Sequence, residues 1–291
     1  DREIFTYLFI QEKVMKKTVL IATGMLLGGA ISVTPVLAGE DDVSEVASKG
    51  GVGFIGLGAA YKPDYEGSDD YEGKVAPFGR YNWASGRYIS LGGTHGSESA
   101  ARVKANILRK EGRDGIELGP VLQYRMKRDD DVDNKKVSKM KEIDAATEAG
   151  AFIGFTSGNW SADLTYAADV SSEHDGSLMY FNGGYRIPVN DKFDMKLGAH
   201  MTWADDDYMD TYFGVSNSDS NRSGLKKYSA SSGIKDAGVS VTGFYRFNQT
   251  WGVAGLLGYT RMLNDAEDSP LVDPVGDENQ MKAVVAVTYT F

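Results

Sequence analysis

Few residues in this chain have the types and spacing that chemistry requires. It contains three His and no Cys, so disulfides and thiolate chemistry are excluded. His95-Gly96-Ser97 could supply a base and a nucleophile for hydrolysis, and Glu173-His174-Asp175 could supply a carboxylate and a base. A hydrolase also needs a group that orients the base, and no nucleophile elbow accompanies either triplet. We therefore predict no catalytic residues and no enzyme activity, with His95 and His174 as ordinary loop residues.

Two runs of acidic residues could bind a divalent cation. Asp129, Asp130, Asp131 and Asp133 form one run, and 205–207 forms the other. Clustered carboxylates can hold Ca²⁺ or Mg²⁺, but the spacing of an EF-hand loop is missing from both runs. The weak metal candidates are Asp129, Asp131 and Asp133. The alternative is a set of solvated loops that share divalent ions with lipopolysaccharide phosphates, and we predict no resident metal or cofactor.

The composition favours one large β-domain. The 291 residues include 35 Gly, 16 Tyr and 12 Phe, a mixture typical of many strands joined by tight turns. The net charge is −10, whereas nucleic-acid binding needs clustered Lys and Arg. Nucleic acid is therefore excluded as a partner.

An export signal stands near the beginning of the sequence. Met15-Lys16-Lys17 precedes an apolar stretch from Thr18 to Val33, and Val36-Leu37-Ala38 forms a small-residue cleavage site before Gly39. We predict an upstream extension at 1–14 and a signal peptide at 15–38. The alternative, a membrane anchor, would lack such a cleavage site.

Long segments beyond residue 51 alternate between apolar and polar residues. In 160–170 the apolar positions begin with Trp160, Ala162 and Leu164, and the positions between them include Ser161 and Asp163. Period-two segments of ten or more residues are long enough to cross a bilayer as tilted strands. We predict about twelve such strands, at 52–61, 74–83, 87–93, 99–110, 115–127, 145–156, 160–170, 177–188, 193–204, 236–247, 251–263 and 280–291.

The predicted connections alternate in length. Short ones, such as 84–86 and 248–250, alternate with connections that are mostly long and rich in Asp, Ser and Gly, such as 128–144 and 205–235. Bacterial outer-membrane barrels have short periplasmic turns and long outer loops. We therefore predict an all-β fold at 52–291, a transmembrane antiparallel β-barrel in the outer membrane of a Gram-negative bacterium, preceded by a periplasmic leader at 39–51. His200 then faces the lumen.

Aromatic residues mark both ends of the predicted barrel. Aromatic side chains should line the two membrane interfaces, and we predict a girdle of six residues: Trp83, Trp160, Trp203, Trp251, Tyr289 and Phe291. The alternating segment that ends at Phe291 also resembles the signal read by the barrel-assembly machinery. We expect that machinery, membrane lipid and lipopolysaccharide as partners.

Several motifs together resemble the MipA/OmpV family of outer-membrane proteins. They include "YEGSDDY" (65–71), "WADDDYMDTYFGVS" (203–216) and "YTRMLNDAEDSPLV" (259–272). The motif residues are Tyr212, Phe213, Gly214, Val215, Arg261, Asp268, Ser269 and Pro270. The chain departs from the family where Met262, Leu263 and Asn264 replace a Leu-Leu-Gly run. We expect the aromatic residues of 212–215 to fold the loop 205–235 back over the barrel mouth and narrow it.

The resemblance implies a scaffold for cell-wall enzymes. It suggests a protein that links a lytic transglycosylase to a murein synthase during peptidoglycan enlargement. We predict that the acidic leader 39–51 contributes to the docking surface; the alternative is a linker that only clears the export machinery. Other family members are described as porin-like or adhesive, so a narrow channel remains the alternative function. Its selectivity would depend on Gln123, Arg125, Asp163 and Lys282.

Overall fold

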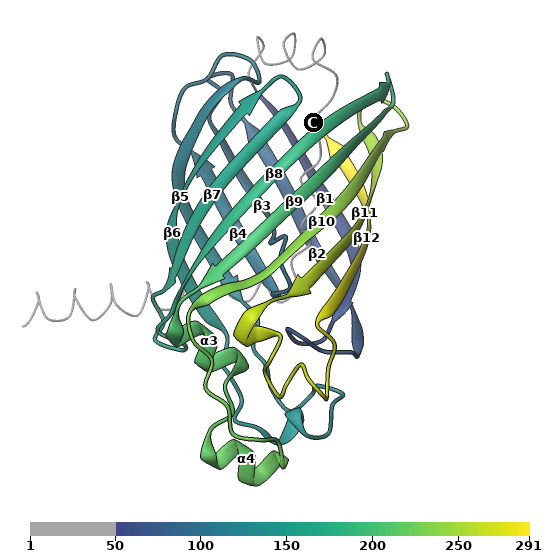
Figure 1. The fold of residues 1–291 in the computed structure, drawn as a ribbon. Coiled ribbons are helices and arrows are strands. Elements are labelled where there is room, and N and C mark those ends of the chain that lie inside the picture. The colour runs from purple at the N-terminus through teal and green to yellow at the C-terminus, as the bar shows by residue number, and fades with distance from the viewer. Residues whose placement is uncertain (1–50) are drawn as a thin grey trace, which may run out of the picture.

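A closed antiparallel barrel forms the whole described part of the chain. The computed structural model describes residues 51–291, so the extension 1–14, the signal peptide 15–38 and all of the leader except Gly51 lie outside the described residues. Each strand pairs with its neighbours in sequence, and β12 pairs with β1 (Figure 1). The predicted fold class is confirmed. The strands are β1 (Val52–Pro63), β2 (Tyr71–Asn82), β3 (Tyr88–Gly93), β4 (Ala100–Asn106), β5 (Gly115–Arg125), β6 (Ala146–Ser157), β7 (Trp160–Asp169), β8 (Ser177–Asn190), β9 (Phe193–Ala204), β10 (Gly233–Arg246), β11 (Trp251–Met262) and β12 (Asn279–Thr290).

The largest error in a predicted strand boundary is at the end of the fourth strand. We expected the fourth strand to reach residue 110, but β4 ends at Asn106. The Asn106 side chain is buried, accepts hydrogen bonds from the backbone N–H groups of Leu108 (3.2 Å) and Leu118 (3.1 Å), and donates to the Gly86 carbonyl (3.1 Å). These bonds replace the strand pairing, as Asn side chains often do at turns. The connection 107–114 is consequently longer than predicted.

The two ends of the barrel differ in their connections. The end that we call the inner end carries the short connections 83–87, 107–114, 158–159, 191–192 and 247–250. The outer end carries the three longest loops, 126–145, 205–232 and 263–278, which contain η1 (Val137–Lys139), α3 (Asp206–Phe213), α4 (Asn217–Ser223) and η2 (Asn264–Ala266) (Figure 1). Because short turns face the periplasm in bacterial barrels, the inner end is the periplasmic one. None of the helices within 51–291 is long and apolar enough to span a membrane.

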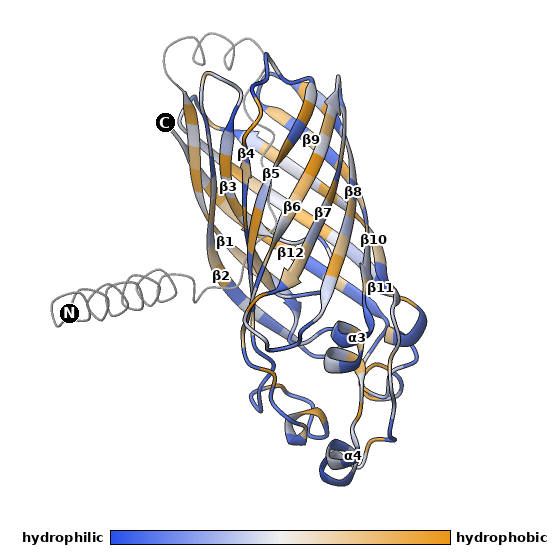
Figure 2. Ribbon diagram, turned by 90° about the vertical axis from the view of Figure 1, so that its left-hand side faces the viewer, coloured by the Kyte–Doolittle hydropathy of each residue, from blue (hydrophilic) through white to orange (hydrophobic). Residues whose placement is uncertain are grey.

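The outer face of the wall is apolar. Along β12, Val285 (68% exposed) and Val287 (49%) face outward, whereas Val284 and Ala286 are buried. In Figure 2 apolar segments run along the strands, while α4 and other outer-loop segments are mainly hydrophilic. Exposed aliphatic residues in this arrangement fit a wall that faces lipid.

Part of the barrel interior is filled with apolar side chains. Phe54 and Phe78 pack with ring centroids 6.3 Å apart, and Phe244, Leu256 and Val284 join the same buried cluster. These residues lie on β1, β2, β10, β11 and β12, around the seam where β12 meets β1. A barrel of this size has an interior too wide for a single layer of side chains. The apolar cluster therefore fills the seam side and leaves free volume toward β3–β9.

Candidate functional site

Helix α3 lies across the outer mouth of the barrel. Asp205 caps it by accepting a hydrogen bond from the Tyr208 backbone N–H (3.1 Å), and the helix ends before Gly214. Its buried face consists of Tyr208, Met209, Tyr212 and Phe213, which join a core formed by strand ends and outer loops. The prediction that 212–215 fold the long loop back over the mouth is confirmed.

Under α3, charged side chains from several strands and loops form a buried cluster. We call this cluster the mouth network, and its members are Glu66, Glu98, Arg125, Glu148, Tyr208, Lys235 and Asp236.

Glu66 lies at the centre of the mouth network. It comes from the β1–β2 loop, accepts hydrogen bonds from Tyr208 Oη (2.6 Å) and Lys235 Nζ (2.7 Å), and lies 3.3 Å from Arg125 Nη1. Since Arg125 is on β5 and Lys235 is on β10, these bonds cross the lumen.

Each buried cation of the mouth network has further partners. Arg125 is 1% exposed and donates from Nε to Glu148 (2.5 Å). Lys235 is fully buried and donates to Asp236 (2.7 Å). Buried charges are tolerated only when they are paired and hydrogen-bonded, and breaking such a pair is strongly destabilising. The network therefore links opposite sides of the barrel beneath α3 with bonds that resist separation.

The family motif residues hold the outer loops together. Ser269 is fully buried, and its Oγ donates to the carbonyl oxygen of Phe213 (2.6 Å). Arg128 donates to the carbonyl of Tyr212 (2.8 Å), and Val215 pairs with Tyr228. The remaining motif positions lie in the same loops: Arg261 pairs with Glu267 (2.6 Å), and Asp268 and Pro270 flank Ser269. Within the described structure these residues pack the outer loops together above the mouth network.

His95 and Ser97 lie inside the barrel and not on its surface. His95 was predicted to be an ordinary loop residue, but in its loop, 94–99, Thr94, Gly96, Ser97 and Glu98 are buried. Ser97 Oγ donates to Asp236 (2.7 Å), whereas His95 stacks on His200 with ring centroids 6.4 Å apart. The prediction of an ordinary loop His was wrong for His95, because the buried Lys235 and Asp236 draw this short loop inward.

His174 was also predicted as an ordinary loop residue, and the structure places it beneath α3. It is 3% exposed, its Nε2 lies 3.1 Å from Glu148 Oε1, and its ring packs edge-on against Tyr208. The exposed neighbours Glu173 and Asp175 do not contact its ring. His174 therefore extends the mouth network and does not form the pair that its triplet suggested.

The acidic runs are not arranged as metal sites. Asp129 pairs with Lys127, its Oδ1 accepts a hydrogen bond from the Asp131 backbone N–H (3.4 Å), and the backbone N–H of Asp133 donates to Asp64 (2.9 Å). In the described range 51–291, no three acidic or His residues are placed to share a metal ion.

The predicted girdle residues lie mostly at the inner end. Trp83, Trp160 and Trp251 are exposed beside the inner turns, and Trp203 precedes α3 at the outer end. Trp251 packs against Tyr289 (5.0 Å between centroids), which stacks with Phe291 (6.4 Å). Contact with membrane interfaces stays a prediction for all six residues.

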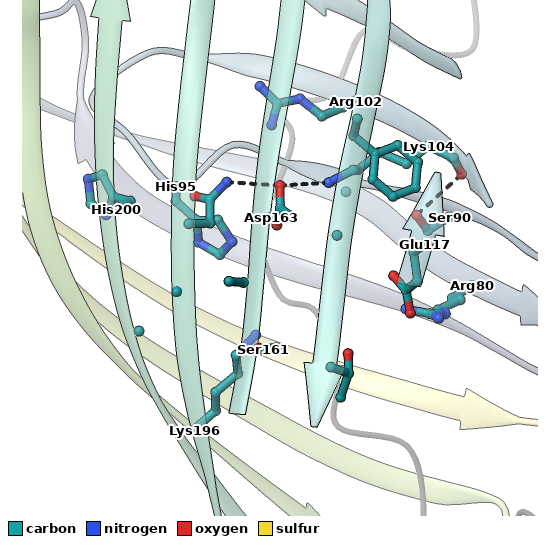
Figure 3. A pocket seen from close by; sticks show the side chains of 18 of the residues that line it. Arg80, Ser90, His95, Arg102, Lys104, Glu117, Ser161, Asp163, Lys196 and His200 are labelled. Carbon is teal, nitrogen blue, oxygen red and sulfur yellow. Dashed lines mark hydrogen bonds and ion pairs between the residues drawn. The ribbon is translucent and has the colours of Figure 1, made fainter. Parts of the chain in front are cut away.

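A cavity of about 220 Å³, lined by both polar and apolar residues, lies between the mouth network and the inner end. Figure 3 shows its charged and polar side chains converging on one space: Arg80, Ser90, His95, Arg102, Lys104, Glu117, Ser161, Asp163, Lys196 and His200. The prediction that His200 faces the lumen is confirmed, because it lines this cavity.

The four residues proposed to set channel selectivity divide between two places. Asp163 lines the cavity, and Lys282 donates to the Gly96 carbonyl (3.0 Å) in the inward loop. Gln123 and Arg125 are buried beneath α3 (0% and 1% exposed). All four face inward, but Gln123 and Arg125 bind the side chains of the mouth network and do not line the cavity.

Sequence reasoning missed most of the mouth network. Glu66, Glu98, Glu148, Lys235 and Asp236 were not singled out. One signal was available: Glu148 is an inward position in a strand of small and apolar residues. A charge at an inward position of a membrane strand indicates an aqueous lumen or a buried partner.

The closed twelve-stranded barrel and its apolar outer face define this protein as an outer-membrane β-barrel, as predicted. Residues 55–291 match the family model described as MltA-interacting protein MipA, and the chain belongs to this family. It is 29% identical over 109 residues to the MltA-interacting protein of Escherichia coli (strain K12), a match that covers 38% of this chain and 43% of that protein. It is 25% identical over 147 residues to YiaT of the same strain, covering 49% of this chain and 57% of YiaT.

The matched segments cover less than two thirds of either relative. Among solved structures, the barrel is similar to a NanC porin (TM-score 0.45, 10% identity, covering 81% of this chain and 98% of that chain). It is also similar to an outer membrane channel from Pseudomonas putida F1 (TM-score 0.45, 10% identity, 83% and 96%).

Proposed function

We propose that this protein is a non-conducting, non-enzymatic outer-membrane scaffold that docks cell-wall enzymes at its inner end. One observation carries the proposal: the mouth network and α3 cross the lumen with hydrogen bonds between buried charges from β5, β6 and β10. A barrel whose lumen is crossed by these bonds does not conduct ions through it, but it provides a rigid anchor in the membrane. The family description, an MltA-interacting protein, supports a lytic transglycosylase as partner, and the predicted murein synthase is the second.

The connection 107–114 is our candidate docking surface. It is the longest inner connection, and its Arg109 and Ile107 (53% exposed) are exposed. Exposed Arg and apolar residues are enriched at protein interfaces. The acidic leader, tested by deleting residues 40–49, remains the second candidate.

Two measurements test the proposal. The folded full chain should give no steady ion flow in a planar bilayer, and it should capture an MltA-type lytic transglycosylase in a periplasmic pull-down. Arg109→Glu should weaken capture, whereas Lys226→Glu, the same charge reversal on an exposed outer-loop residue, should not. Stable conductance together with no capture would make the channel function correct and the scaffold function wrong.

A further inference from the structure

The cavity on the inner side of the mouth network has an excess of positive charge. Its lining contains four cationic residues, Arg80, Arg102, Lys104 and Lys196, and two carboxylates, Glu117 and Asp163. The whole chain has the opposite balance, with a net charge of −10. The cationic excess is therefore a local property of this cavity.

Both carboxylates already have partners. Asp163 pairs with Lys104 (3.0 Å) and also accepts from Asn182 (3.2 Å). Glu117 accepts from Lys110 (2.9 Å), which comes from the inner connection 107–114, and from Tyr88 Oη (2.8 Å). Within residues 51–291, Arg80, Arg102 and Lys196 form no direct ion pair. Figure 3 shows Arg80 beside Glu117, so the cationic excess belongs mainly to Arg102 and Lys196.

Arg102 gives the most specific indication of a missing anion. Its Nε donates to Gln123 (2.7 Å), and its guanidinium carbon lies 4.0 Å from the centroid of the Tyr180 ring, so the group is held in place. Arg102 is 5% exposed, and its Nη2 is buried with no hydrogen-bond partner in the described structure. A buried donor without an acceptor is unfavourable, and an anionic oxygen in the adjacent cavity would supply one.

The rest of the lining suits a hydroxylated ring. Ser90, Ser161, Ser240 and Thr242 bring hydroxyl groups to the cavity, and Phe152 brings an aromatic ring. Hydroxyls both donate and accept hydrogen bonds, and the face of an aromatic ring provides an apolar surface. The volume of about 220 Å³ is below the range of about 300–1,000 Å³ typical of sites for drug-sized ligands, so it fits a molecule with a single ring.

Part of the cavity lining lies beside the inner end. Ser161 is the second residue of β7, and Thr156 precedes the last residue of β6, so both lie beside the inner turn 158–159. On the other side, the mouth network crosses the lumen. We therefore expect a ligand to arrive from the periplasm.

We propose that this cavity binds a small sugar-sized anion, a single hydroxylated ring that carries a carboxylate or a phosphate. The anionic group contacts Arg102, and the ring hydroxyls contact the Ser and Thr side chains and Lys196, which lies at the opposite end of the cavity from Arg102 (Figure 3). This site is separate from the proposed docking surface, and the proposal does not depend on the scaffold function.

Isothermal titration calorimetry on the folded full chain in detergent tests the proposal. The probes are glucuronate, glucose 6-phosphate and neutral glucose, so that the carboxylate and phosphate sources of the charge are compared directly. We expect at least one anionic sugar to bind and glucose not to bind. Glucose binding as tightly as the anions, or no binding of either anion, would overturn the proposal.

Lys196→Gln is the decisive variant, because Lys196 has no ion pair whose loss would destabilise the described barrel. We expect it to weaken binding of the anionic sugar by about tenfold or more, as a charge-assisted hydrogen bond is lost. The matched control is Lys192→Gln, which removes the same charge from the exposed turn before β9 and should bind like the unchanged protein. Equal affinity in both variants would exclude Lys196 from the site and overturn the assignment.

Discussion

At the scale of single residues, the stability of the mouth network depends on the ion pairs and hydrogen bonds that each buried charge makes. Glu148 is fully buried and contacts Arg125 Nε (2.5 Å), Gln123 Nε2 (2.5 Å) and His174 Nε2 (3.1 Å). These contacts join β5, β6 and the β7–β8 loop at one carboxylate. A neutral residue of the same shape would fill the space but would leave Arg125 without its nearest negative charge.

The substitution Glu148→Gln should therefore destabilise the barrel. Breaking a buried ion pair by removing one partner costs about 3–5 kcal/mol, because the remaining charge stays buried. We expect the free energy of unfolding to fall by about 3 kcal/mol in urea titrations followed by tryptophan fluorescence. Glu173→Gln, at an exposed neighbour of His174, is the control and should stay within about 0.5 kcal/mol. Equal free energies of unfolding for the two variants would show that the ion pair between Glu148 and Arg125 does not stabilise the barrel.

At the scale of elements, α3 closes the mouth while α4 fixes the outer loops to each other. The α3 face that carries Tyr208 and Phe213 is buried against strand ends. Helix α4 lies further out and contacts the segment around η1 through Asp219, which accepts from the Lys141 backbone N–H (2.7 Å). The two helices of one loop therefore have different roles.

Removing α3 should open the barrel. If residues 206–213 are replaced by a short Gly-Ser linker, the mouth network loses Tyr208 and its cover, and water can enter between Arg125 and Glu66. We expect ion conductance to appear in planar bilayers. Replacing 217–223 by the same type of linker should produce no ion conductance, because α4 does not contribute to the mouth network. If neither variant conducts ions, the barrier to ion flow lies elsewhere, in the inward loop 94–99.

The docking of α4 should depend on pH. Burial alone would raise the pKa of Asp219, but hydrogen bonds from Ser216 Oγ (2.5 Å) and the Lys141 N–H (2.7 Å), with the Arg222 ion pair, outweigh it and lower the pKa.

A carboxylate with a lowered pKa stabilises the fold above its unfolded pKa of about 3.9, and this contribution is lost as the pH falls through the folded pKa. An NMR titration should place the Asp219 midpoint below 3.9, and Asp219→Ala should speed hydrogen exchange of the Lys141 amide. A midpoint at or above the model-peptide value would contradict the assignment.

At the scale of the whole molecule, the β1–β12 seam closes the wall. Gly53 and Phe291 exchange two backbone hydrogen bonds of 3.0 and 2.9 Å, and Phe291 stacks with Tyr81 of β2 (6.5 Å between centroids). The inner end of the seam is thus held by both backbone and ring contacts.

Phe291→Ala should weaken this closure. Aromatic pairs contribute about 0.5–1.5 kcal/mol beyond the area that they bury, and Phe291 stacks with both Tyr81 and Tyr289. We expect a lower yield of folded, heat-modifiable protein in the outer-membrane fraction on gel electrophoresis. Trp160→Ala removes an exposed aromatic residue away from the seam and is the matched control. An equal yield of both variants would remove the special role of Phe291.

The strands of the barrel wall could be predicted from the sequence far better than the side chains and loops that fill the barrel. Strand positions depend on a local period of two, so β7 and β12 could be recognised from their own residues. The mouth network depends on pairs far apart in the chain: Glu66 and Lys235 are 169 positions apart, and Arg125 and Tyr208 are 83 apart. No local pattern in the loop 94–99 indicates that it turns inward, because its place is set by Lys235 and Asp236. The same limit applies to the cavity, whose cations come from β2, β4 and β9.

The pairing of β12 with β1 also sets the order of events during assembly. Until the final strand arrives, both margins of the growing sheet expose unpaired backbone groups, which invite pairing with other chains. Contacts between the two ends of a chain form slowly, because a long loop must close first. The charged residues of the lumen can be shielded from lipid only after this step. The nascent protein therefore remains vulnerable to aggregation until its last strand is in place.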